Sequence, residues 1–283
     1  MNIYNATRTI YNIKLQTCMM ANIPYQPLPN TTLNEKFDIL EYEQQNCVNN
    51  LKSDRPLYPT IKGIVIGNGG LSLLDSDIFD LKLGKHSPID GALFNHLPFV
   101  LREENNDLPD TDKLNYRLRK ELYIDGKKYV AYYLRIIKES ELFYKPDILY
   151  VDNNKAIPSI KVLSTDRTDI LNPSPVKDNR MSTYNNTVEV YNILRYNFQI
   201  SERDMLELEN VFNVLNIKNR LITELGFVTG IDVPLNNYKE LVYSQIGFFI
   251  DLSLDLEYLK NQNSITIEIG GGEIIPLMKD LDV

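Results

Sequence analysis

The sequence predicts an α+β chain built mostly of antiparallel β modules, with a few helices and an extended N-terminal arm. Strand-forming residues flank Asp125 and Gly126 in "KELYIDGKKYVAYYLRII", and this dipeptide is the one that a two-residue type I′ hairpin turn prefers. Residues 221–234 and 238–256 are rich in β-branched and aromatic residues, which favour strands. Behind Ser201, a residue suited to cap a helix, apolar residues recur at helical spacing: Met205, Leu208, Phe212 and Leu215.

The first 30 residues are expected to form the extended arm. "YNATRTIYNIKLQT" alternates loosely, as a strand does, and "IPYQPLPN" places three prolines within six residues. Because proline fixes φ and removes a donor, this piece predicts a stiff connector. The capping-box pair Thr32 and Glu35 then predicts a helix that ends near Asn50.

The middle of the chain begins with the apolar run 64–66, which predicts a strand that enters the glycine cluster at residues 67–70. Residues 71–110 are expected to be rich in loops. A short helix over residues 111–119 precedes the hairpin at Asp125.

The C-terminal half is expected to be β-rich with one inserted helix. Residues 157–180 carry many turn formers, and the alternating segment 187–200 predicts a strand. A loop holding Gly230 and Pro234 is expected between the next two strands, and a triple-glycine turn is expected at 270–272.

This pattern predicts three parts: an extended arm at residues 1–30, an α+β domain with a helix and the hairpin at 31–155, and a β-rich domain with one inserted helix at 156–283. The arm and the tail after Gly272 are the segments expected to contact neighbouring subunits. Removal of residues 1–30 is expected to leave a folded protein that no longer assembles.

Composition limits the partners. The net charge is −8 and the pI is near 5.0, and no basic run gathers the Lys and Arg that a nucleic acid needs. No stretch of eighteen apolar residues predicts a membrane span, and the first residues do not resemble a signal peptide. Cys18 and Cys47 suit a reducing compartment rather than a disulfide framework.

The glycine cluster in "IKGIVIGNGGLSLLDSD" resembles a loop that binds phosphate, and we compared it with the two common patterns. Gly67 and Gly69 fit the dinucleotide pattern G-x-G-x-x-G, but Ser72 stands at its last position and no helix is expected to follow. The G-K-[ST] ending of a P-loop is missing as well. We therefore interpret the glycines as residues that let the strand turn.

No other motif predicts catalysis or a bound metal. His86 and His96, the only histidines, are interpreted as polar packing residues. Asp75, Asp77 and Asp80 are interpreted as a solvated acidic loop, although whether the segment from Asp75 to Asp80 binds a cation is left open, since its carboxylates suit hard cations.

Further chemical alternatives have no motif of their own. "GxSxG" does not occur, and carboxylates are numerous enough that a two-carboxylate hydrolase stays open without positive support. "GGGEI" at residues 270–274 has no helix behind it. The basic and aromatic stretch at residues 115–133 is interpreted as a half-buried hairpin rather than a surface for single-stranded nucleic acid. We expect no catalytic, cofactor-binding or metal-binding residues and no cofactor.

One segment resembles a known group of proteins. Residues 87–137, "SPIDGALFNHLPFVLREENNDLPDTDKLNYRLRKELYIDGKKYVAYYLRII", are similar to virion structural proteins of large tailed bacteriophages. The residues that match are Leu93, Phe94, His96, Pro98, Phe99, Leu101, Arg102, Asn106, Asp107, Leu108, Tyr116, Leu118, Arg119, Ala131, Tyr132, Tyr133 and Leu134. "LITELGFVTGID" and "YKELVYSQIGFFI" resemble the C-terminal strands of the same group.

The resemblance implies a particle component of the tail, baseplate or neck that assembles in the host cytoplasm. Its partners would be other virion proteins and copies of itself, with no nucleic acid, membrane or small-molecule substrate. Tyrosine, of which there are 18, suits such interfaces because it offers a large contact area with one polar tip. The alternatives are a nucleotide- or sugar-binding enzyme that uses the turn at residues 67–70, and a host-cell adaptor protein.

Overall fold

The computed structural model describes residues 6–39, 57–73, 81–152, 159–162, 183–199, 201–235, 238–255 and 264–279. The chain divides into two compact units, unit 1 with residues 1–141 and 197–266 and unit 2 with residues 142–196 and 267–283. Each unit thus joins segments that are distant in sequence, which differs from the expected contiguous division after residues 30 and 155. The α+β class with mostly antiparallel strands is confirmed.

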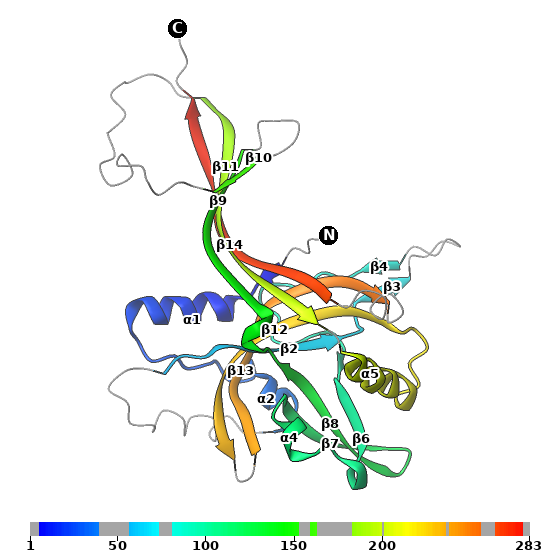
Figure 1. Cartoon of the computed structure of the whole chain (residues 1–283). Helices are drawn as coiled ribbons and strands as arrows, with labels where there is room; N and C mark the ends of the chain where they lie inside the picture. The colour runs from blue at the N-terminus through cyan, green and yellow to red at the C-terminus, as the bar shows by residue number, and fades with distance from the viewer. Residues whose placement is uncertain are drawn as a thin grey trace. The chain divides into compact units, whose positions relative to one another are not determined.

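An eight-stranded antiparallel sheet forms unit 1 (Figure 1). Its main order is β1-β13-β12-β2-β8-β6, while β5 pairs with β2 and β7 pairs with β8. The strands are β1 (Ala6–Arg8), β2 (Thr60–Gly67), β5 (His96–Leu97), β6 (Val100–Glu103), β7 (Tyr116–Ile124), β8 (Lys127–Ile136), β12 (Leu221–Leu235) and β13 (Tyr238–Asp255). Two short strands, β3 (Leu71–Leu73) and β4 (Leu81–Leu83), form a separate pair.

Among its described residues, unit 1 has the helices α1 (Ile10–Ala21), α2 (Leu33–Lys36), α4 (Asp110–Lys113) and α5 (Glu202–Val214), with single turns η2 (Glu104–Asn106) and η3 (Glu139–Glu141). Both expected caps are confirmed: Thr32 forms a capping box with Glu35, and Ser201 forms one with Asp204.

Two expected helices are shorter than predicted. The helix behind Thr32 ends at Lys36, because Asp38 takes a positive φ of 53° that breaks the helical path. The remainder of that prediction, to Asn50, lies outside the described residues. The helix expected at 111–119 is α4, which ends at Lys113, and Tyr116 already begins β7.

The extended strand predicted across the N-terminal arm is wrong over residues 10–21, which form α1. Thr9 caps the helix by accepting a hydrogen bond from Asn12 N, and Asn22 ends it in the left-handed conformation with φ 54°. The loose alternation misled because apolar residues fall on both faces of this helix. From residue 6 to residue 30, where the structure describes the segment, β1 is the only strand.

The N-terminal segment is not a free arm, because it lies along the edge of β13. Residues 6–8 pair with residues 248–250, and Thr9 N donates to Gly247 O at 3.0 Å. Further along the same edge, Asn34 Nδ2 donates to Leu241 O at 2.6 Å. The side-chain Oδ1 of Asn34 accepts from Ser244 N at 3.1 Å, so one side chain takes the place of a neighbouring strand at this edge.

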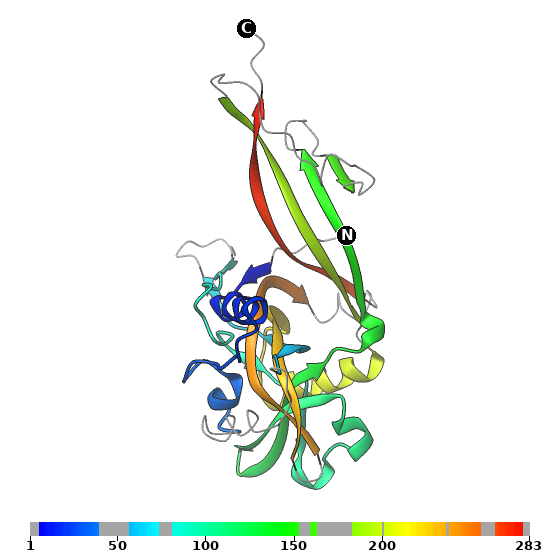
Figure 2. The same cartoon turned by 90° about the vertical axis from the view of Figure 1, so that its left-hand side faces the viewer.

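The hairpin predicted at Asp125 is confirmed. Ile124 is paired with Lys127, and the two turn residues have positive φ values, 49° at Asp125 and 79° at Gly126, as a type I′ turn requires. The long β7 and β8 ribbons lie side by side in both views (Figure 2).

The two strands predicted at residues 221–234 and 238–256 are confirmed as β12 and β13, which pair antiparallel, but the loop expected at Gly230 and Pro234 is wrong. Both residues lie inside β12, and Pro234 faces Lys239 near the strand end. Gly230 leaves room for a cross-strand side chain, since a Cβ there would lie 2.5 Å from Leu241 Cγ.

The core of unit 1 gathers buried residues from α2, α5, the sheet and the loops beside them: Leu33, Phe37, Val65, Leu93, Leu101, Leu118, Ala131, Tyr133, Leu134, Val211, Val228, Leu241, Ile246 and Phe249.

Unit 2 is a four-stranded sheet in the order β10-β9-β11-β14. Its strands are β9 (Leu142–Asp152), β10 (Ser159–Val162), β11 (Thr183–Gln199) and β14 (Ser264–Lys279). The strand predicted at 187–200 is thus confirmed as part of β11. The predicted triple-glycine turn at 270–272 is wrong, because these glycines continue β14. The tail after Gly272 is therefore part of a sheet as far as Lys279.

Candidate functional site

The glycine cluster links β2 to β3, and no helix follows it. Gly70 has a φ of 70°, which favours glycine, and the turn interpretation is therefore supported. Gly67 and Gly69 lie against the loop before β5. A Cβ at Gly69 would lie 2.6 Å from Phe94 Cβ and 2.7 Å from Asn95 N, so neither position has room for a side chain to be added without a shift.

The backbone amide of this turn binds a carboxylate of the chain itself. Gly69 N donates to Glu224 Oε1 at 2.5 Å, and Asn95 N donates to the same oxygen at 3.2 Å. Phe94 N donates to Glu224 Oε2 at 2.6 Å. Three backbone N–H groups therefore converge on one carboxylate from β12, which is the arrangement that a protein uses to hold an anion.

His86 completes the surroundings of Glu224. Its Nε2 atom lies 2.9 Å from Glu224 Oε2, and its Nδ1 atom lies 3.4 Å from Asp90 Oδ2. The imidazole ring is stacked between Phe94 and Phe249, with 4.1 Å between ring centroids on each side. Both His86 and Glu224 side chains are buried, 0% and 2% exposed. The interpretation of His86 as a polar packing residue is supported, although its partners were not foreseen.

A second carboxylate stands beside this group. Asp251 of β13 is directly opposite Glu224 in the register, and burial raises its pKa above the ordinary value. Its Oδ1 atom is buried without a hydrogen-bond partner. Like charges on facing residues destabilise a strand pair. We infer that the amides and His86 offset this cost at Glu224.

We term the cluster of Glu224, His86, Asp90, Gly69 and Asp251 the carboxylate nest. The negative charge that it holds is the buried carboxylate of Glu224. The N–H donor that a phosphate would need at Gly69 is directed at Glu224 Oε1. The arrangement anchors the loop over residues 84–95 to the central strands, because it joins β12, the turn after β2 and that loop.

His96 is a half-buried packing residue that lies against Phe37 of the core. Burial, with a smaller effect of Lys36, lowers its pKa to about 3. Its Nε2 atom accepts a hydrogen bond from Leu93 N at 3.0 Å, and its ring meets Phe37 edge-on at 5.1 Å between centroids. This placement agrees with the interpretation made from the sequence.

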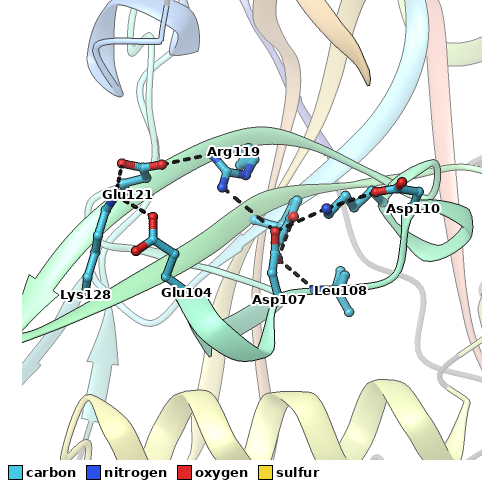
Figure 3. Close-up of polar contacts among 9 residues, drawn as sticks. Glu104, Asp107, Leu108, Asp110, Arg119, Glu121 and Lys128 are labelled. Atoms are coloured by element: carbon cyan, nitrogen blue, oxygen red, sulfur yellow. Dashed lines mark hydrogen bonds and ion pairs between the residues drawn. The ribbon is translucent and has the colours of Figure 1, made fainter. Parts of the chain in front are cut away.

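A second polar group surrounds Asp107, next to η2 (Figure 3). Asp107 Oδ1 accepts from Leu108 N at 2.7 Å and from the Tyr132 hydroxyl at 2.8 Å. Lys113 lies 3.4 Å and Arg119 3.8 Å from Asp107 Oδ2. The basic residues of this stretch therefore face carboxylates within the chain.

The same pairing continues along the hairpin. Lys128 lies 2.5 Å from Glu104 and 2.9 Å from Glu121, and Arg119 also contacts Glu121 at 3.3 Å (Figure 3). The basic and aromatic stretch at 115–133 is thus a paired hairpin surface, and its cations are neutralised locally.

A cavity of about 220 Å³ lies beside this group, and Glu240 lines it. Glu240 is 1% exposed, and burial raises the pKa of its carboxyl. Its Oε1 atom accepts from Leu118 N at 2.9 Å and from Leu241 N at 2.8 Å. Leu118 has a positive φ of 55° that turns its N–H toward Glu240, so this carboxyl joins β7 to β13.

A larger groove of about 550 Å³ lies between β6 and α5. Arg102 Nε donates to Glu207 Oε2 at 3.2 Å, and Asn210 Nδ2 donates to Leu101 O at 2.6 Å. The charged groups on its walls all have partners within the chain, since Glu103 pairs with Lys127 and Arg203 pairs with Asp112. Leu206, which also lines the groove, is 62% exposed.

Other residues singled out from the sequence do not extend these sites. Asp75, Asp77 and Asp80 lie outside the described residues, so whether the segment from Asp75 to Asp80 binds a cation stays open. Cys18 is a free thiol, and Cys47 is not among the described residues. Within the described part of the chain, no group of three His, Cys, Asp or Glu residues is placed to hold a metal ion. No helix there is long and apolar enough to cross a membrane.

Glu224 and Glu240 were missed by reasoning from the sequence. Their signal is present but weak: each is a single acidic residue inside an apolar strand, in "LITELGF" and "YKELVY". A carboxylate in such a position is buried, and a buried carboxylate needs donors. The sequence does not say which donors, because those of Glu224 lie about 130 to 155 positions away.

Comparison with known proteins gives one match. No curated protein and no solved structure is significantly similar to the chain. The chain matches a family described as "Family of unknown function (DUF7208)" over residues 1–282, nearly its whole length. The chain therefore belongs to the DUF7208 family.

Proposed function

We propose that this chain is a structural protein of a bacteriophage virion, a component of the tail, baseplate or neck that acts through protein contacts and not as an enzyme. It assembles in the host cytoplasm with other virion proteins and with copies of itself. The resemblance of residues 87–137 to such proteins is the first support.

The single observation that carries the proposal is the hydrogen bond from Gly69 N to Glu224. The one motif of the sequence that suggested a small-molecule ligand uses its amide to hold a carboxylate of the same chain. This bond gives the glycine turn a role within the fold, which supports a protein that acts through its surfaces rather than through a bound ligand.

Exposed apolar side chains give the second support. Ile13, Met20 and Ile23 in the N-terminal segment are 47%, 82% and 55% exposed, and Phe94 and Ile89 are 51% and 65% exposed. Apolar surface of this kind marks contact sites for other proteins when it is contiguous.

The experiment is a quantitative mass-spectrometric analysis of particles purified from the virus that carries this coding sequence. The proposal expects the chain in a fixed ratio to the major structural protein after gradient purification and a salt wash. A chain that is made during infection but absent from washed particles contradicts it.

The alternative, a nucleotide- or sugar-binding enzyme, is tested separately by thermal shift against a panel of nucleotides and sugars. A ligand at 100 times its Kd adds about 2.7 kcal/mol of stability, which such a scan detects. Stabilisation that Gly69→Ala abolishes would favour the alternative.

A further inference from the structure

Helix α1 is apolar on two opposite faces. Tyr11 and Leu15 are buried on one face, against the sheet. Ile10, Ile13, Thr17 and Met20 recur at intervals of three, four and three residues, so they share the opposite face. A helix with this pattern is normally covered on both sides.

The outer face is open to solvent. Ile10, Ile13 and Met20 are 41%, 47% and 82% exposed, and Thr17 is exposed as well. The helix stands at the surface of unit 1 in Figures 1 and 2. The outer stripe of α1, defined as residues 10, 13, 17 and 20, is therefore a surface without a cover among the described residues.

The charge of the stripe indicates its partner. The chain carries 38 acidic and 30 basic residues, but α1 has no acidic residue. Its only charged residue, Lys14, donates to Gln26 O at 2.8 Å and lies over the Tyr25 ring, away from the stripe. Two copies with a net charge of −8 repel each other over most of their surfaces, and the stripe is a place where they meet without like charges.

The stripe also suits symmetric pairing. A two-fold interface brings the same patch of both subunits together, so the patch must be complementary to itself. An uncharged apolar row is self-complementary, whereas a row with one sign of charge is not. In an antiparallel pair centred between residues 16 and 17, Ile13 of one copy lies opposite Met20 of the other, and Thr17 lies beside the two-fold axis.

We propose that α1 pairs with α1 of a second copy of this chain through the outer stripe. In the proposed function copies of the chain assemble with one another, and the outer stripe is the surface through which they meet. The dimer itself does not depend on the proposed function, but its role in a particle does. A stripe on one helix covers less than the roughly 800 Å² per partner of a standard interface, so the dimer is weak, with a micromolar Kd.

The first test is sedimentation velocity of the full chain between about 1 and about 100 µM, a range that brackets a micromolar Kd. The wild type should move from monomer to dimer. Ile13→Glu and Met20→Lys should each raise the Kd at least about tenfold, which corresponds to about 1.4 kcal/mol. Leu206→Glu is the matched control, since it places a charge on an exposed apolar position of α5 and should leave the Kd unchanged. Circular dichroism checks that each variant keeps the wild-type fold.

The second test is disulfide trapping in a chain that carries Cys18→Ser and Cys47→Ser. Thr17→Cys should form a symmetric cross-link under mild oxidation, and Leu206→Cys should not. A wild type that is monomeric to 100 µM, or a dimer that Ile13→Glu leaves intact, overturns the inference. So does a monomer whose outer stripe binds a different virion protein.

The two proposals fail in different ways. A monomeric chain that is nevertheless a fixed component of washed particles removes the α1 pair and keeps the proposed function. A dimer through α1 in a chain absent from particles keeps the pair and removes the proposed function.

Discussion

Gly69 and Glu224 lie 155 positions apart in the sequence, and the backbone N–H of Gly69 donates a 2.5 Å hydrogen bond to the carboxylate of Glu224. The same carboxylate accepts bonds from two amides of the loop before β5. A turn that resembles a phosphate cradle thus holds an internal anion. This relationship accounts for the glycines and for the buried acid in β12 together.

Glu224→Gln should destabilise the protein by about 3 kcal/mol. The glutamine NH₂ group would face the backbone N–H groups that now donate to the carboxylate, so buried donors would be left without acceptors. Chemical denaturation followed by circular dichroism measures the change. Glu103→Gln is the matched control: it loses an ion pair with Lys127 in which both side chains are substantially exposed, and its unfolding midpoint should stay close to that of the wild type. Equal effects of the two substitutions would contradict the role of the carboxylate nest.

Gly69→Ala should cost roughly 1–3 kcal/mol, the usual range for overpacking, because its Cβ would collide with Phe94 and Asn95. Gly91→Ala is its control, since there the nearest atom lies 3.5 Å from the added Cβ and the backbone takes no positive φ. That variant should match or slightly exceed the wild type in stability. The test is to measure the melting temperatures of Gly69→Ala and Gly91→Ala against the wild type, and the account expects a lower value for Gly69→Ala alone.

Asn34→Ala should destabilise the protein by about 2 kcal/mol or more, because it leaves the buried Leu241 carbonyl and Ser244 amide of β13 without their partner. The exposed strand edge should also promote aggregation on heating, which light scattering detects. Asn105→Ala, at an exposed position in η2, should behave as the wild type. An Asn34 variant of unchanged stability would mean that the edge of β13 needs no cover.

The hairpin turn should accept Asp125→Asn without loss, since asparagine also takes a positive φ in a type I′ turn. Gly126→Ala should cost about 1 kcal/mol, because its φ of 79° disfavours a side chain while the surrounding space is open. Urea denaturation of both variants tests the assignment. A neutral Gly126→Ala would show that the turn relaxes to another type.

The contribution of Glu240 should depend on pH. Its pKa in the folded protein is raised above the ordinary value of 4.5, so folding favours the protonated carboxyl. The stabilisation is complete below pH 4.5 and is lost as the pH rises through the folded pKa. Glu240→Gln cannot ionise and should lack this loss.

The free energy of unfolding of the wild type minus that of Glu240→Gln should therefore fall as the pH rises from 4.5. Its slope cannot exceed about 1.4 kcal/mol per pH unit for one proton. Denaturation series of both proteins from pH 4 to pH 8 give the difference. A difference that rises with pH would contradict burial as the dominant influence on Glu240.

Local patterns predicted much of the fold. The capping box at Thr32, the helix cap at Ser201 and the turn at Asp125 are correct because each depends on residues within four positions of one another. The strands of β12 and β13 follow from composition. Helix α1 was missed because its two apolar faces imitate alternation, although Thr9 and Asn22 marked its ends.

The remaining errors concern positions whose conformation is set by distant neighbours. Gly230 reads as a loop residue but accommodates Leu241 across the sheet. The carboxylate nest joins residues from four separate segments, and no pattern within one segment encodes it. The sequence shows single acidic residues inside apolar strands, which indicates buried carboxylates. Their hydrogen-bond partners can be identified only from the folded structure.

The central claim is that the amides of the glycine turn hold Glu224 and are closed to outside anions. The most direct measurement is an amide-resolved NMR titration of the full chain with inorganic phosphate and then with ATP. The account predicts that the Gly69, Phe94 and Asn95 resonances do not move in the wild type. Saturable shifts of these three amides, with displacement of the Glu224 carboxylate, would contradict it.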